Sequence, residues 1–62
     1  MNLNEAKKAI KKCSKVFGYV KFTEDHGSYV RLVKADVLFM LEEVAETDEI
    51  NMTVEKDGVF IN

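Results

Sequence analysis

The chain has 62 residues, a net charge of −2 and a hydrophobic content of 47%. A domain of this length buries only about 60% of the surface that its unfolded form exposes, so we expect a thin core. Cys13 is the only cysteine and His26 the only histidine. A single cysteine excludes an intrachain disulfide. One cysteine and one histidine are too few soft ligands for a structural zinc ion. Efficient packing or oligomerisation then has to stabilise the fold.

No segment approaches the roughly 18 apolar residues of a membrane span, and the first residues lack the apolar run of a signal peptide. Together with the single thiol, these features predict a cytoplasmic protein that does not associate with membranes. The sequence has no glycine-rich phosphate loop, and we expect no cofactor.

The net charge conceals an asymmetry between the two halves of the chain. Residues 1–34 carry eight Lys or Arg against three Asp or Glu, a net charge of +5. Residues 35–62 carry one Lys against eight Asp or Glu, a net charge of −7. Such halves usually neutralise each other within one fold or across a dimer. The alternative is a basic face that is kept for an anionic partner.

Residues 3–17 have an apolar stripe at helical spacing, which predicts an amphipathic helix. Lysines fill its remaining faces, Asn2 or Asn4 is expected as the N-cap, and Gly18 is expected to end the helix. The stripe consists of Leu3, Ala6, Ile10, Cys13 and Phe17.

Residues 18–23 and 29–33 alternate between apolar and polar side chains, which predicts a β-hairpin. A two-residue loop would pair Phe22 with Arg31 and mix the two faces of the hairpin. A three-residue loop at 25–27, with Gly27 in the left-handed conformation, pairs Phe22 with Val30 and keeps the apolar side chains together. We therefore predict the three-residue loop.

The same order of elements follows in the second half of the chain. A helix is predicted from Lys34 or Ala35 to Glu46, then strands at 49–55 and 59–62 joined by a two-residue Asp57-Gly58 turn. Phe39 and Met40 extend the apolar surface of this helix beyond the usual width. Its inward stripe is expected to contain Val37, Leu38, Leu41, Val44 and Ala45.

The doubled helix–strand–strand unit predicts a single domain over residues 1–62, with pseudo-repeats at 3–33 and 34–62. The expected fold class is α+β: a two-layer sandwich in αββαββ order, with two helices on one face of a four-stranded, mainly antiparallel sheet. The covered face is expected to bear Val20, Phe22, Val30, Leu32, Ile50, Met52, Val54, Val59 and Ile61. The open face is expected to bear Tyr19, Lys21, Thr23, Tyr29, Arg31, Val33, Asn51, Thr53, Glu55 and Phe60.

The sequence indicates that the protein is not an enzyme. Cys13 falls on the buried stripe and His26 at the tip of a turn, whereas a catalytic Cys–His pair needs hydrogen-bond reach. The acidic side chains between residues 42 and 49 lack the spacing and central glycine of a calcium loop, so we expect a solvated face there. No metal site is predicted.

A thin core with apolar side chains on its outer surfaces favours a protein–protein interaction module, expected as a homodimer. Tyr and Arg are frequent anchors in protein interfaces. The expected contact residues are Tyr19, Lys21, Tyr29, Arg31 and Phe60 on the open sheet face, with Phe39 and Met40 on the second helix.

Nucleic-acid binding is the alternative function. Aromatic and cationic side chains on a sheet bind single strands by stacking and charge, and Tyr19, Lys21, Tyr29 and Arg31 offer that combination. The lysine-rich first helix is a second basic surface. However, the sequence pI is near 5.3, whereas nucleic-acid modules are usually basic.

Two segments, GYVKF at 18–22 and GSYVRLVKADVL at 27–38, resemble parts of small uncharacterised proteins encoded by bacteriophages and prophages. The resemblance covers the middle of the chain and supplies no catalytic residues. It implies a bacterial or phage cytoplasm and an accessory role, in which the protein binds a host or phage protein.

Overall fold

The computed structural model describes residues 1–62 and contains two helices and one four-stranded sheet. The sheet is mixed but mostly antiparallel, which agrees with the α+β class predicted from the sequence. Neither helix has the length and apolar character that crossing a membrane requires. In chain order the elements are α1 (Leu3–Lys12), β1 (Val16–Lys21), β2 (Gly27–Leu32), α2 (Lys34–Leu41), β3 (Met52–Glu55) and β4 (Gly58–Ile61).

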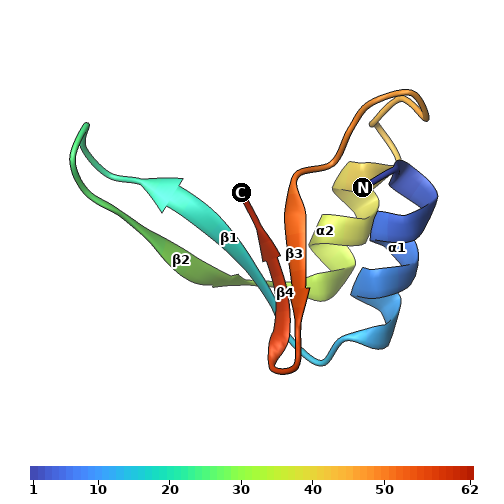
Figure 1. Cartoon of the computed structure of the whole chain (residues 1–62), viewed down its shortest axis with the longest axis horizontal. Helices are drawn as coiled ribbons and strands as arrows, with labels where there is room; N and C mark the ends of the chain where they lie inside the picture. Colours follow the sequence, from blue (N-terminus) through green and yellow to red (C-terminus); the bar gives the residue numbers. More distant parts are fainter.

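The strand order of the sheet is β2-β1-β4-β3, so the two hairpins meet at its centre. There β1 and β4 pair in parallel, with Val16 beside Val59 and Phe17 beside Phe60. Figure 1 shows α1 and α2 side by side against one part of the sheet, with the β1–β2 hairpin extending away from them as an arm. β2 and β3 are the two edges of the sheet.

The first helix begins at the cap that the sequence predicts. The Asn2 side-chain oxygen accepts a hydrogen bond from the Glu5 backbone N–H at 2.8 Å, and the Glu5 carboxylate accepts one from the Asn2 amide at 2.6 Å. This arrangement satisfies backbone and side-chain groups at the start of the helix. The part of the predicted stripe that lies within the helix points into the core, where Ala6 and Ile10 are fully buried.

The prediction that the first helix continues to Phe17 is wrong. α1 ends at Lys12, and Cys13 has extended backbone dihedrals. Phe17 fits both a helical stripe and a two-residue alternation, and strand pairing decides between them. Because Val16 pairs with Val59 and Phe17 with Phe60, these residues begin β1 instead. Gly18 is therefore a buried strand residue, and an added Cβ there would lie 2.7 Å from Leu32 Cδ1.

The predicted register of the first hairpin is also wrong, by four residues. Gly18 pairs with Val30 and Val20 with Ser28, and residues 22–26 form the loop. The His26 carbonyl closes this loop by accepting hydrogen bonds from the N–H groups of Phe22 and Thr23, at 2.8 and 3.1 Å. Gly27 does not adopt the predicted left-handed conformation. Since the shift is an even number of residues, the strand residues keep their predicted faces.

The second helix ends at Leu41 rather than at Glu46 and is therefore shorter than predicted. Its last turn tightens: Glu42 donates to the Phe39 carbonyl at 3.2 Å, and Glu43 to the Met40 carbonyl at 3.1 Å. The last turn contains no basic residue, and acidic side chains follow it. Negative charge opposes the negative end of the helix dipole, which accounts for the early termination.

The second hairpin turns one residue earlier than predicted. Glu55 pairs with Gly58, so the two-residue loop is Lys56-Asp57. Gly58 has a φ of +157°, and a Cβ at this position would lie 2.7 Å from the Lys15 carbonyl oxygen. The backbone just before β1 lies close to Gly58, since Val59 donates a hydrogen bond to the same carbonyl at 3.0 Å. A side chain does not fit there, so the position requires glycine.

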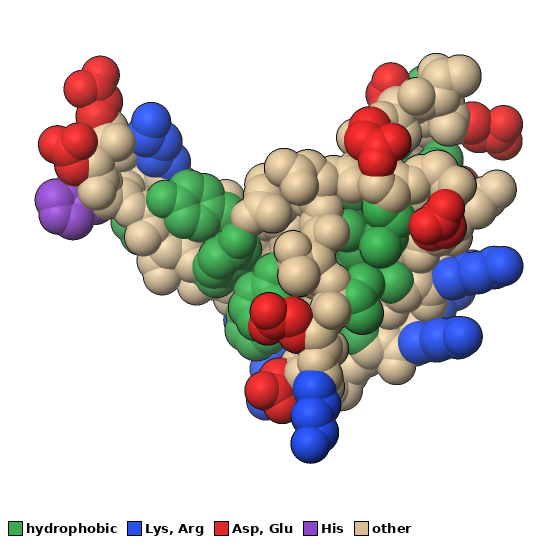
Figure 2. All heavy atoms as spheres, in the orientation of Figure 1, with side chains coloured by type: hydrophobic (Ala, Val, Ile, Leu, Met, Phe, Trp, Pro, Cys, Tyr) green, Lys and Arg blue, Asp and Glu red, His purple; other side chains and the backbone are tan.

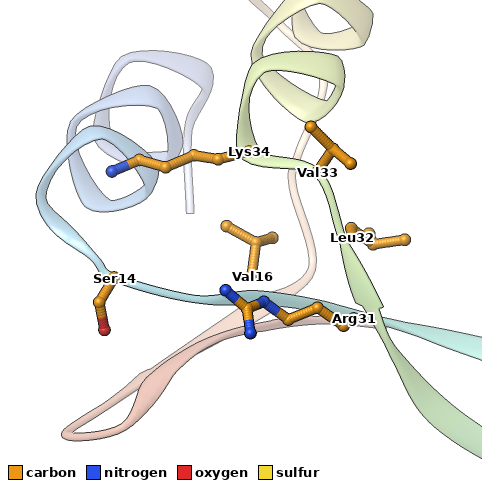
Figure 3. Close-up of a pocket in the computed structure, with 6 residues that line it drawn as sticks. All are labelled: Ser14, Val16, Arg31, Leu32, Val33 and Lys34. Atoms are coloured by element: carbon orange, nitrogen blue, oxygen red, sulfur yellow. The ribbon is translucent and has the colours of Figure 1, made fainter.

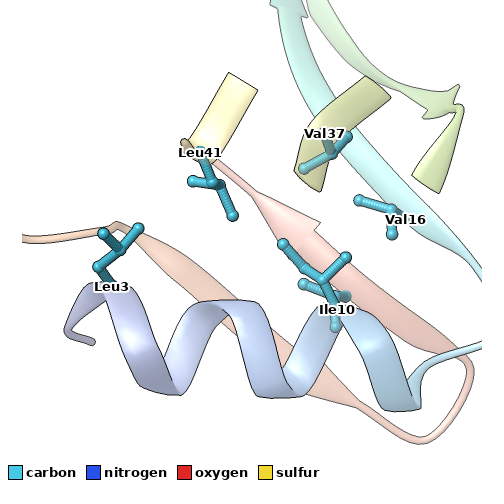
Figure 4. Packing of buried hydrophobic residues seen from close by; sticks show 6 residues of the cluster. Leu3, Ile10, Val16, Val37 and Leu41 are labelled. Atoms are coloured by element: carbon cyan, nitrogen blue, oxygen red, sulfur yellow. The ribbon is translucent and has the colours of Figure 1, made fainter. Parts of the chain in front are cut away.

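The core lies where both helices meet the central strands, as Figure 4 shows. It contains one cluster of buried side chains: Leu3, Ile10, Val16, Val37, Leu41 and Val59. The distal part of the hairpin does not join this cluster. Phe22 and Val54, which the sequence places on the covered face, are 63% and 53% exposed. Phe22 lies in the hairpin loop beyond both helices (Figure 1), and Val54 lies on the edge strand β3 beside a hollow that Ala9 and Lys12 of α1 also line.

Candidate functional site

An aromatic cluster lies on the sheet face opposite the core, and it contains three of the predicted contact residues. Tyr19 packs edge to face against Tyr29, with ring centroids 5.4 Å apart, and Tyr29 against Phe60 at 5.2 Å. The Tyr29 hydroxyl donates to the side-chain oxygen of Asn62. We call the rings of Phe17, Tyr19, Tyr29 and Phe60 the aromatic face.

Phe17 is the member of the aromatic face that the sequence prediction missed. Its ring stacks on Phe60 with a centroid distance of 4.8 Å and an interplanar angle of 12°. The signal was present as an alternation through Phe17, Tyr19 and Lys21, but the helical stripe also accommodated Phe17. Its position follows from the parallel pairing of β1 with β4, which no local pattern specifies.

Two predicted cations flank the aromatic face. Strand alternation places Lys21 on the same face as Tyr19, and Arg31 on the same face as Tyr29. Both cationic side chains are exposed. Figure 2 shows hydrophobic side chains reaching the surface along the hairpin and down the middle of the sheet. This face therefore offers aromatic area with positive charge beside it.

The remaining predicted contact residues form a separate surface on α2. Phe39 is 74% exposed and Met40 67% exposed, whereas Val37 and Leu41 of the same helix are buried. A helix that is apolar around its whole circumference is normally covered on all sides. We call Phe39 and Met40 the α2 patch. The structure does not bring this patch together with the aromatic face.

The charges of the two halves meet at only a few points. The N-terminal ammonium pairs with Glu49, and Lys7 lies 3.5 Å from Glu42. Because the carboxylates of Glu49 and Glu42 are exposed to solvent, such pairs contribute little stability. Most lysines of α1 remain at the surface, where Figure 2 shows them along one side of the molecule. Neutralisation within the fold is therefore partial.

Groups with catalytic potential are not gathered at one place. The half-buried Cys13 thiol donates to the Ile10 carbonyl at 3.1 Å, so its hydrogen bond is made to the last turn of α1. His26 is exposed in the hairpin loop, where its ring lies 3.2 Å from the Thr23 hydroxyl. No group of three or more His, Cys, Asp or Glu side chains is arranged to hold a metal ion.

One hollow lies at the end of β2, between the end of α1 and the start of α2. Figure 3 shows Val16, Leu32 and Val33 beside it, with Lys34 reaching across toward α1. The Lys34 ammonium donates to the carbonyls of Lys11 at 2.9 Å and Cys13 at 2.6 Å. Lys34 thereby caps α1, and the hollow presents apolar side chains with Arg31 at its rim.

Searches against protein-family models, curated proteins and solved structures find no match to this chain.

Proposed function

We propose that this chain is a non-enzymatic protein–protein interaction module that works as a homodimer. The observation that carries the proposal is the distribution of burial. Nine of 62 residues are buried, whereas eight large hydrophobic side chains are exposed. Single exposed hydrophobic residues are ordinary, but most of these belong to the hairpin arm and α2. A second chain that covers part of them adds apolar burial to a core that is small.

The proposal includes the finer architecture predicted from the sequence. The two helices form one layer of a two-layer sandwich, and the sheet forms the other. The aromatic face and the α2 patch then look in different directions, so a dimer can use one surface and leave the other for a further protein. The cytoplasmic location and the phage or prophage origin also belong to this proposal, and they rest on the single thiol and the two resembling segments.

The experiment that tests the proposal is a measurement of molecular mass in solution over a range of concentrations. We expect the wild-type chain to associate into a dimer as its concentration rises. A chain that stays monomeric throughout would contradict the proposal.

Nucleic-acid binding is the second candidate, and the exposed Lys21 and Arg31 beside Tyr19 support it. The packing of the rings opposes it. Tyr19 and Tyr29 meet at an interplanar angle of 70°, and Tyr29 and Phe60 at 84°, so these rings do not present parallel faces to successive bases. The one parallel pair, Phe17 and Phe60, is stacked on itself. Glu55 also falls on this sheet face by strand alternation.

A titration with a fluorescent single-stranded oligonucleotide at low salt separates these candidates. A nucleic-acid site would bind there and lose affinity steeply as salt is added. Under the proposed function, we expect no saturable binding even at low salt. Saturable binding with a steep salt dependence would favour the second candidate.

A further inference from the structure

β2 is an edge strand with little protection against pairing with another strand. It pairs with β1 without interruption from Gly27 to Leu32 and has no bulge. Natural proteins commonly block sheet edges with Pro and charged residues, whereas β2 contains no Pro or Lys and Arg31 is its one charged residue. The other edge, β3, has four residues, against six in β2. The longer edge is therefore the open one.

We propose that two copies of the chain pair antiparallel along β2 and form one continuous eight-stranded sheet, with Val30 on the two-fold axis. This inference rests on the proposed function, because it names the surface through which the homodimer forms. Edge-to-edge pairing supplies backbone hydrogen bonds to a strand that has one neighbour in the monomer.

Symmetry restricts how two identical edge strands can pair. A two-fold axis that relates neighbouring antiparallel strands of one sheet is perpendicular to that sheet, so every side chain keeps its own face. Directly opposite residues in an antiparallel pair point to the same face. One residue of β2 must therefore lie opposite its own copy, and the alternatives reduce to the choice of that residue.

The side chains of β2 favour Val30 as this residue. With Val30 on the axis, Tyr29 of each copy lies opposite Arg31 of the other, so no like charges face each other on this side of the sheet. Placing Arg31 on the axis would bring two like charges together, which is unfavourable. Placing Tyr29 there would leave Arg31 opposite Gly27, which has no side chain to contact.

Burial on the other face of the strand agrees with the same register. Val30 is half-buried and lies on the core side of the sheet, since it pairs with the buried Gly18. Its copy would lie directly opposite, and Leu32 would lie opposite Ser28 of the second copy. A Val–Val contact at the axis removes apolar surface from water and continues the core side of the sheet across the interface.

A charge-exchange experiment at Val30 tests both the surface and the register. In the proposed dimer, Val30→Lys places two ammonium groups opposite each other, and Val30→Glu places two carboxylates there. We expect each variant alone to dimerise about tenfold or more weakly than wild type, because like charges on the axis repel. An equimolar mixture of the two should recover association. Val54→Lys is the matched control on the other edge strand and should dimerise like wild type.

The outcomes distinguish this inference from the proposed function. If wild type dimerises and Val30→Lys dimerises equally well, the β2 interface is wrong and self-association stands. If both charged variants are weakened but their mixture does not associate, Val30 does not face its own copy and the register is wrong. If wild type is monomeric at every concentration, self-association itself is wrong.

A second variant keeps the test decisive if the charged variants fold poorly. Val30→Cys in a Cys13→Ser background places two thiols at the axis, within the range of cross-strand Cβ separations that admits a disulfide. Under mild oxidation we expect a covalent dimer from this variant and none from Val54→Cys in the same background. A covalent dimer from the Val54 variant alone would place the interface on β3 and overturn the inference.

Discussion

The Lys34 side chain completes the hydrogen bonding at the end of a helix to which it does not belong. The carbonyls at the end of α1 receive hydrogen bonds from Lys34, which is more than 20 residues away and begins the other helix. A cation at the C-terminal end of a helix is favoured by the helix dipole and by unpaired carbonyls. Lys34 therefore stabilises the C-terminal end of α1 and holds the start of α2 against that end.

Replacing Lys34 with Met should lower the free energy of unfolding by about 1–2 kcal/mol, the usual contribution of charge-assisted hydrogen bonds and helix-end cations. Met keeps an unbranched apolar side chain and replaces the ammonium end with an uncharged thioether. Urea denaturation followed by circular dichroism measures the change. Lys8→Met is the matched control, because Lys8 is an exposed residue of α1, the helix that Lys34 caps. This substitution should lower the free energy of unfolding by less than about 0.5 kcal/mol. Equal stability of the two variants would refute the capping role.

At the scale of elements, α2 combines two surfaces with different roles. Val37 and Leu41 contribute to the core, while Phe39 and Met40 point away from it. The apolar character of the outer surface therefore does not stabilise the monomer. The helix therefore holds the fold with one side and leaves the other side free for the proposed partner.

Substitutions on the two sides of α2 should separate stability from binding. Phe39→Ser combined with Met40→Ser should change the free energy of unfolding by less than about 0.5 kcal/mol per site, as exposed substitutions usually do. Leu41→Ala should lower it by about 2–5 kcal/mol, because it leaves a cavity in the core. Thermal and urea denaturation of dilute protein measures both. A large loss of stability in the double variant would show that the α2 patch belongs to the fold.

Local patterns predicted the type of each element and the start of both helices, but not where most elements end. The alternation in β1 and β2 assigned the strand faces, and the aromatic face was found apart from Phe17. The ends failed where distant pairing decides them. Val16 and Phe17 become strand because β4 lies beside them, and α2 stops early because acidic residues follow it. The hairpin register depended on a left-handed Gly27, which the His26 carbonyl closure makes unnecessary.

At the scale of the whole molecule, the two helix–strand–strand units contribute unequally. Each supplies a helix and a central strand to the core, but the first unit also supplies a hairpin arm that extends beyond the helices (Figure 1). The arm carries basic and aromatic side chains on one face and an acidic loop at its tip. This arm has little to pack against in one chain, and the proposed dimer would place a second chain beside it.

Sedimentation equilibrium of the wild-type chain tests this account most directly. Samples from about 1 μM to about 1 mM cover weak to moderately tight association. The account predicts that the weight-average mass rises from the monomer value of 7.1 kDa to twice that value and then levels off, which indicates a closed dimer. A mass that stays at 7.1 kDa over the whole range would contradict it.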